Sequence, residues 1–203
     1  YKLAVMNNLH TVIPFSLQYQ VGSEVAQALL FLKNMSQVEG EYTLVSAVQR
    51  FGPMDSRLKE DGFPLADAAA SFLVTPSRSI FKSGFNLLNV QIGRVRRSLQ
   101  HTMEDILNRC LNGCNMEKSD IEWDISHRFS EEFIEAALET LPEAEHLTRD
   151  IYPYVDFGCA DPVISMYRIF GEKNAKKQGC GVVWFYGRTG TVGAIIVNYC
   201  EEE

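Results

Sequence analysis

The stretch "DIEWDISHRFSEEFIEAALETL", residues 120–141, decides how the C-terminal part of this 203-residue chain is built. Residues 121–125 form a short apolar run that is typical of a buried strand. Ser126 and His127 follow directly, and Ser130 then opens an amphipathic segment with helical spacing. The pattern therefore predicts a strand that ends at a titratable imidazole just before a helix, which makes His127 a candidate functional residue.

Helical and strand-like patterns alternate on both sides of this stretch. The helices are predicted over 23–35, 96–114, 130–141 and 162–174. The strands are predicted over 43–49, within 65–76, over 121–125, at the start of 146–158, and over 181–187 and 192–199. Residues 79–93 are predicted to form a strand, a turn and a second strand, and "RTGT" closes a final hairpin. Apolar strands that alternate with helices indicate an α/β layered fold.

Composition limits the classes of function. The chain is 46% hydrophobic and 22% charged, with a net charge of −7, which favours a globular protein and argues against nucleic acid as a partner. The segment "LADAAASFLVTPSR" superficially resembles a bacterial helix-turn-helix, but the negative net charge disfavours that interpretation. No apolar run reaches about 18 residues, and the start lacks the layout of a signal peptide. We therefore expect no membrane span and a cytoplasmic location.

The cysteines do not suggest a metal centre or a disulfide framework. There are five of them, and their spacing shows no pairs of the kind found in zinc sites. Cys110 and Cys114 would share one helix face, but no second pair of ligands lies near them in the sequence. Free thiols and no metal site are therefore expected.

The order of several segments resembles the ketoacyl synthase III family. "QIGRVRRSLQHTMEDILNRCLNGCNMEKSDIEWDISHRFSEEFIEAALETLP", residues 91–142, is similar to the part of those enzymes in which a strand delivers a histidine before a helix. "VDFGCADPVISMYRIF" is similar to their Gly-Asn-Thr loop and its helix, and "KKQGCGVVWFYGRTGTVGAIIVNY" to their closing hairpin. Upstream, "DGFPLADAAASFLVTP" and "SLQYQVGSEVAQALLFLKNM" occupy the places of a glycine-rich strand and of the helix that carries the nucleophile.

This resemblance implies a thiolase-like layered fold of two related halves, with a buried helix between them. Residues 1–86 would be the remainder of the N-terminal half and residues 87–203 the C-terminal half, with an N-terminal part of the fold lying outside this sequence. Members of the family form dimers and act on acyl-CoA or acyl-carrier thioesters in fatty-acid, polyketide or other specialised metabolism. No bound cofactor is expected.

The family uses a cysteine, a histidine and an asparagine, and the resemblance places them one by one. His127 matches the histidine, whereas the nucleophile position falls at Gly22, or within one residue at Val21 or Ser23. The asparagine position falls at Cys159. Two further matches, to the glycine loop that lines the site, are Gly187 and Gly190.

Three functional interpretations follow. The first is a diverged subunit without the nucleophilic cysteine, which partners an active homologue. The second is an active acyltransferase in which Ser23 is the nucleophile and His127 the base, although Ser23 also suits a helix N-cap. The third is a binding or scaffold protein that has kept only the fold, in which His127 is simply a strand-end histidine bonded to the backbone.

Two further sets of residues carry open alternatives. Cys159 is either a nucleophile or a small residue that fills the place of the asparagine. A basic cluster near residue 96 would face the phosphates of CoA or an acidic helix of a carrier protein, or would be only a solvated helix start. Its members are Arg94, Arg96 and Arg97.

Overall fold

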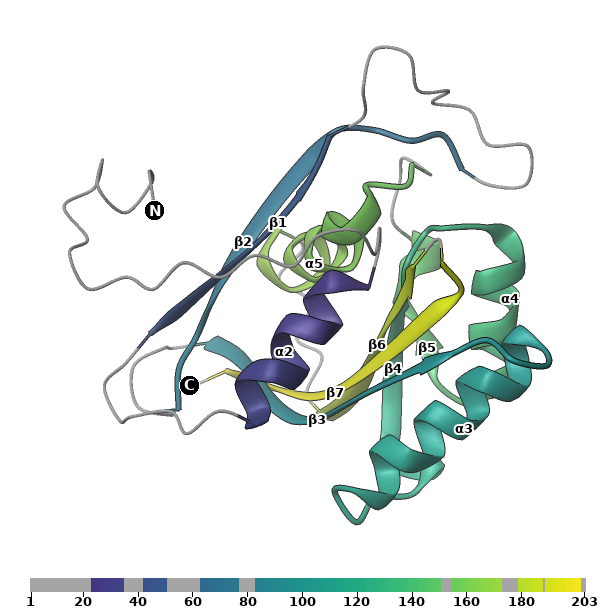
Figure 1. Ribbon diagram of the computed structural model, residues 1–203. Coiled ribbons are helices and arrows are strands. Elements are labelled where there is room, and N and C mark those ends of the chain that lie inside the picture. The colour runs from purple at the N-terminus through teal and green to yellow at the C-terminus, as the bar shows by residue number, and fades with distance from the viewer. Residues whose placement is uncertain are drawn as a thin grey trace, which may run out of the picture.

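The computed structural model describes residues 23–34, 42–50, 63–76, 83–150, 155–172, 179–187 and 189–201. Its largest element is a five-stranded mixed sheet with the strand order β3-β7-β6-β4-β5 (Figure 1). The strands are β3 (Ser83–Arg94), β4 (Ile121–Ser126), β5 (Glu145–His146), β6 (Gly179–Gly187) and β7 (Thr191–Glu201). β4 is parallel to β5 and β6, whereas β7 is antiparallel to β3 and β6. Strand β4, which leads to His127, therefore has a neighbour on each side.

Helices cover both faces of this sheet (Figure 1). One face carries α3 (Leu99–Asn112) and α4 (Glu131–Thr140), and the other carries α2 (Glu24–Asn34) and α5 (Asp161–Met166). A π-helical stretch, Tyr167–Glu172, continues α5. Side chains of β6 alternate between the two cores, because successive residues of a strand point to opposite faces. The result is a helix–sheet–helix arrangement of three layers, as the α/β pattern predicts.

The helices begin and end where local chemistry directs them. The Ser98 hydroxyl accepts a hydrogen bond of 3.2 Å from the His101 N–H and caps α3, and Ser130 caps α4 through the Phe133 N–H at 3.2 Å. The predicted inward residues of α3 pack on the sheet, and four of them are fully buried: Met103, Ile106, Leu107 and Cys110.

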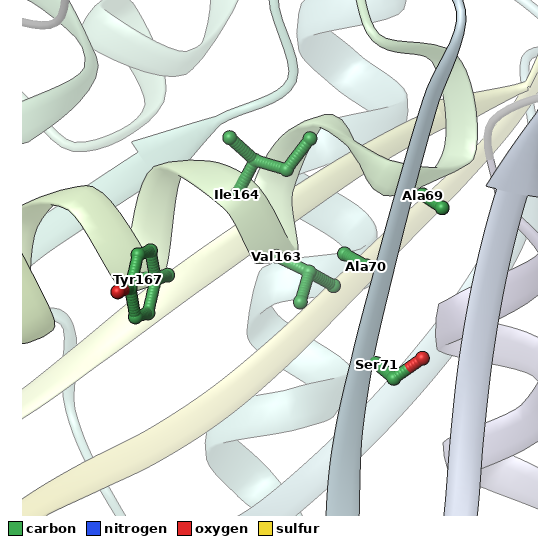
Figure 2. Close-up of a pocket in the computed structure, with 6 residues that line it drawn as sticks. All are labelled: Ala69, Ala70, Ser71, Val163, Ile164 and Tyr167. Carbon is green, nitrogen blue, oxygen red and sulfur yellow. The ribbon is translucent and has the colours of Figure 1, made fainter.

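A second, two-stranded sheet lies on the α5 side. Its strands β1 (Thr43–Gln49) and β2 (Ala68–Val74) are antiparallel. Between β2 and α5 lies a hollow of about 210 Å³, which Figure 2 shows. It is lined by Ala69, Ala70, Ser71, Val163, Ile164 and Tyr167. His127 is not among these residues, so the hollow is separate from the candidate site.

Two expectations from the sequence are wrong. Residues 83–93 hold no turn: Ser83 and Gly84 already belong to β3 and pair with Glu201 and Cys200 of β7. The long pairing with β7 decides the conformation of this segment, and residues 79–82 of the predicted range lie outside the described residues. The helix predicted from residue 96 begins only at Leu99, because Ser98 is its cap.

β3 crosses the division between residues 86 and 87, and the two-half organisation stays a prediction. No helix in the described part of the chain is long and apolar enough to span a membrane.

Candidate functional site

His127 lies directly after β4, in the three-residue connection to the cap of α4. Its backbone N–H donates to the carbonyl oxygen of Trp184 in β6 at 3.1 Å, which extends the pairing of the two strands by one residue. The side chain is only 1% exposed. Strand pairing on one side and the capped start of α4 on the other therefore fix the imidazole inside the protein.

Both ring nitrogens of His127 have partners within the chain. The Tyr186 backbone N–H donates to Nδ1 at 3.3 Å, so Nδ1 carries a lone pair and the neutral ring carries its proton on Nε2. Nε2–H donates to Oδ1 of Asp156 at 2.8 Å, and Asp156 is 2% exposed. The imidazole is thus held in one tautomer with both of its hydrogen-bonding positions in use.

Asp156 is fixed by its own backbone. It forms a parallel bridge with Leu65, in which the Asp156 N–H donates to Pro64 O at 2.9 Å and the Ala66 N–H donates to Asp156 O at 3.0 Å. Its Oδ1 also accepts the Gly158 N–H at 2.6 Å. A segment far upstream in the sequence therefore positions the carboxylate that binds His127.

A buried ion pair lies immediately beside this contact. Asp161 Oδ1 accepts from Nε and Nη2 of Arg128 at 3.0 and 2.8 Å, and Oδ2 accepts the Arg128 backbone N–H at 2.9 Å. Neither side chain is exposed. The residue after His127 is thereby joined to the first residue of α5, and the loop with Asp156 and Cys159 is held against the end of β4.

An aromatic group lies on the other side of the imidazole. The rings of His127 and Phe129 meet edge to face with centroids 5.9 Å apart, and Phe129 contacts Tyr186 at 4.5 Å. Burial raises the pKa of the Tyr186 phenol, and nearby Glu132 adds to the rise. The contact of Tyr186 with the imidazole is its backbone N–H, and its ring packs against Phe129.

Cys159 lies in the turn that follows Asp156 (Gly158–Ala160) and is 6% exposed. Burial raises the pKa of its thiol to about 11, and the carboxylates of Glu24 and Asp156 add to the rise. At neutral pH this side chain is a protonated thiol, not the thiolate that acyl transfer needs. The structure thus places Cys159 in the turn beside Asp156, where burial disfavours its thiolate form.

Ser23 directly precedes α2 and is fully buried. Its Oγ accepts from Nε2 of Gln27 at 3.2 Å, and among the hydrogen bonds of the described residues none joins Ser23 to His127. Glu24, the next residue, is nevertheless near enough to Cys159 to influence its thiol. The start of α2 therefore approaches the site, whereas Gly22 and Val21 lie outside the described residues.

The two glycines form the hairpin between β6 and β7. The Gly190 N–H donates to Gly187 O at 2.8 Å, and Gly190 has φ +74, a left-handed conformation that favours glycine. Gly187 directly follows Tyr186, so the hairpin begins where β6 binds the imidazole.

The three arginines lie on the surface. Arg94 ends β3, and Arg96 and Arg97 form the bend before Ser98. All three are exposed, and in the described ranges none of them takes part in an ion pair.

Sequence reasoning missed Asp156, Gly158 and the Arg128–Asp161 pair. In the sequence, Asp156 and Gly158 are marked only by the run Asp-Phe-Gly at residues 156–158, and Asp161 only by the Asp-Pro pair that begins a helix. The described residues hold no group of three or more His, Cys, Asp or Glu side chains that could bind a metal ion.

Solved structures share this architecture. The 3-oxoacyl-(acyl carrier protein) synthase III of Pseudomonas aeruginosa superposes with a TM-score of 0.74 at 13% identity, covering 100% of this chain and 71% of that chain. The 3-oxoacyl-[acyl-carrier-protein] synthase III of Aquifex aeolicus gives a TM-score of 0.69 at 15% identity, covering 98% and 71%. ChlB3, described as an acyltransferase, gives 0.73 at 15% identity, covering 98% and 72%.

Comparison by sequence alone finds less: no family model matches the chain, and no curated protein matches it. The structural matches cover nearly the whole chain, which agrees with the order of the motifs. The chain therefore has the thiolase-like fold of the 3-oxoacyl-acyl-carrier-protein synthases III, and the resemblance read from its motifs is confirmed at the level of the fold.

Proposed function

We propose that this chain is a ketosynthase III-like subunit of fatty-acid, polyketide or other specialised metabolism that does not itself catalyse condensation. One observation carries the proposal: His127 gives its only N–H to Asp156 at 2.8 Å, while Nδ1 accepts from Tyr186. A condensing histidine must donate to a thioester oxygen as that oxygen becomes an enolate. In this chain an internal carboxylate takes the donor, so none remains for a substrate.

The other two positions of the catalytic set support the same conclusion. At the asparagine position, the protonated thiol of Cys159 is a weak donor compared with an amide N–H. At the nucleophile position, Ser23 is the nearest hydroxyl in the sequence, and its Oγ is bonded to Gln27. At these positions, the part of the chain that the structure describes offers neither the groups that stabilise an enolate nor an activated nucleophile for a covalent acyl intermediate.

The proposed role is that of a partner. The chain would complete a dimer with a homologue that has the cysteine, and its exposed arginines would receive the acyl-carrier protein or CoA thioester. Exposed guanidinium groups that form no ion pair with any residue the structure describes, on a chain of net charge −7, suit phosphates or an acidic helix. No bound cofactor is needed for this role.

Intact-mass measurement tests the proposal directly. The full-length protein, incubated with a panel of acyl-CoAs, is expected to show no covalent acyl adduct in its intact mass. In a separate purification, it is expected to co-purify with a cysteine-bearing homologue. A stable acyl adduct that disappears in Ser23→Ala would contradict the proposal and favour an acyltransferase that uses Ser23 with His127. A scaffold protein would be favoured if neither an acyl adduct nor a partner is found and if the His127→Ala variant keeps the biological activity of the wild type.

A further inference from the structure

Two hydrogen-bond donors converge on one oxygen atom, Oδ1 of Asp156. The His127 Nε2–H approaches it at 2.8 Å and the Gly158 backbone N–H at 2.6 Å. Two fixed donors within hydrogen-bond distance of one oxygen position are the arrangement by which enzymes bind an oxyanion. We infer that His127 and Gly158 form a two-donor oxygen-binding site, and that the carboxylate of Asp156 is its built-in occupant.

The backbone of Gly158 is shaped for this role. Gly158 has φ +58, in the left-handed region that side chains disfavour. A Cβ atom at this position would also lie only 2.6 Å from Cγ of Gln49. A glycine is therefore required to turn this N–H toward the same oxygen that His127 binds.

The occupant does not leave the site readily. The backbone N–H and C=O of Asp156 are both hydrogen-bonded, to Pro64 and Ala66 respectively, and its side chain is 2% exposed. Departure of the carboxylate would break the bridge to Leu65 or turn a buried charge away from its donors. The site is therefore closed to external oxygen ligands as long as Asp156 is present.

The geometry also defines the class of ligand. Because both donors address a single atom, a vacated site would take one oxygen of a carboxylate or of a thioester carbonyl. A small carboxylate is the closest substitute, since it restores the negative charge that Asp156 supplies. The thioester part of this inference rests on the proposed function, whereas binding of a small carboxylate depends only on the contacts of Oδ1.

The test is a binding experiment with sodium acetate on Asp156→Ala. We expect acetate to shift the NMR resonances of the His127 Nε2–H and the Gly158 amide saturably in this variant and to leave both unchanged in the wild-type chain. Asp156→Asn, which keeps an oxygen in place, should not respond. The double variant Asp156→Ala/Gly158→Ala should lose the response, because one donor is misdirected.

A matched control is Asp124→Ala. Asp124 is also a buried partner of a histidine, but its donors are divided: His146 Nδ1 lies 2.6 Å from Oδ1 and Ser126 Oγ lies 3.1 Å from Oδ2. The Asp124→Ala variant also loses a buried carboxylate, but it does not leave two donors that point to one oxygen position. Acetate should therefore shift the resonances of His146 and Ser126 in this variant much less than it shifts those of His127 and Gly158 in Asp156→Ala.

Each result decides the question. A folded Asp156→Ala that ignores acetate, or that responds no more than Asp124→Ala, would overturn the inference. Should Asp156→Ala fail to fold, acetate but not chloride should restore the refolded fraction, and equal recovery in both salts would count against the site. Acetate binding is measured on the isolated chain, so it is independent of whether a partner or an acyl adduct is found.

Discussion

At the scale of single residues, the Arg128–Asp161 pair holds the loop that contains Asp156 against the end of β4. The carboxylate binds the guanidinium through two nitrogens and the Arg128 backbone N–H as well. Both side chains are 0% exposed, so the pair is surrounded by protein and gains little from solvent. Removal of Asp161 would take away the carboxylate that faces the buried Arg128 guanidinium beside His127.

We therefore expect Asp161→Ala to lower the free energy of unfolding by about 3–5 kcal/mol. Urea unfolding followed by circular dichroism measures the change. The double variant Arg128→Met/Asp161→Leu, which removes both charges, should recover a large part of the loss. A loss under about 1 kcal/mol for Asp161→Ala would mean that Arg128 reaches water, because exposed pairs contribute only that much.

Cys110 gives a prediction on pH. Burial raises the pKa of its thiol from the ordinary value of 9.0 to about 12, and nearby Cys114 adds to the rise. The unfolded chain therefore loses this proton first, and the stability that the neutral thiol contributes is full below pH 9 and lost between pH 9 and 12. Within that window the free energy of unfolding falls by about 1.4 kcal/mol per pH unit on this account.

The comparison of wild type with Cys110→Ala isolates this effect. The difference between their free energies of unfolding should be constant below pH 9. Above pH 9 the free energy of unfolding of the wild type should fall relative to that of Cys110→Ala. Met103→Ala is the control, since Met103 is equally buried in the same helix and has no proton to lose. A difference for Cys110→Ala that follows the Met103→Ala curve at every pH would refute the prediction.

At the scale of elements, α2 rests on β7 through a close approach of small residues. A Cβ at Gly193 would lie 2.7 Å from Cβ of Ala26, closer than carbon atoms pack. Overpacking of this kind costs about 1–3 kcal/mol, so Gly193→Ala should lower the free energy of unfolding by that amount. Ala26→Gly in the same chain should restore part of it.

Gly84 offers a matched control for this variant. It also lies in a strand of the same sheet, but a Cβ there would meet no atom within 4 Å. Gly84→Ala should leave the stability unchanged or raise it slightly, because it restricts the unfolded chain. Equal losses for the two variants would show that strand propensity, not the contact with α2, decides the effect.

The sequence was a good guide to elements with a strong internal period. The inward residues of α3 and the run that became β4 follow helix and strand spacing, and Ser98 and Ser130 are local caps. The turn predicted within residues 79–93 is absent from residues 83–93, because pairing with a distant strand decides their conformation. Asp156 was missed for a similar reason: it contacts His127 from 29 positions away, and no local spacing reveals such a contact.

On the scale of the whole molecule, charge is unevenly distributed. The chain has a net charge of −7, yet Arg94, Arg96 and Arg97 are close together in the sequence, exposed and without ion pairs in the residues that the structure describes. The start of α4 presents Glu131 and Glu132 instead. A local basic surface on an acidic chain favours a partner that is itself acidic.

The corresponding prediction concerns Arg96→Glu/Arg97→Glu. If these side chains receive an acidic carrier, the double variant should bind holo-acyl-carrier protein more weakly than wild type, with a smaller dependence on salt, because screened charge attraction is lost. The control Arg109→Glu/Lys118→Glu changes the net charge equally, at exposed positions of which Arg109 is already paired with Asp105. Surface plasmon resonance across a range of salt concentrations distinguishes the two variants. Equal weakening in both would assign the effect to net charge alone and remove the basic cluster as a docking surface, whereas a loss confined to Arg96 and Arg97 would locate the carrier at the bend between β3 and α3.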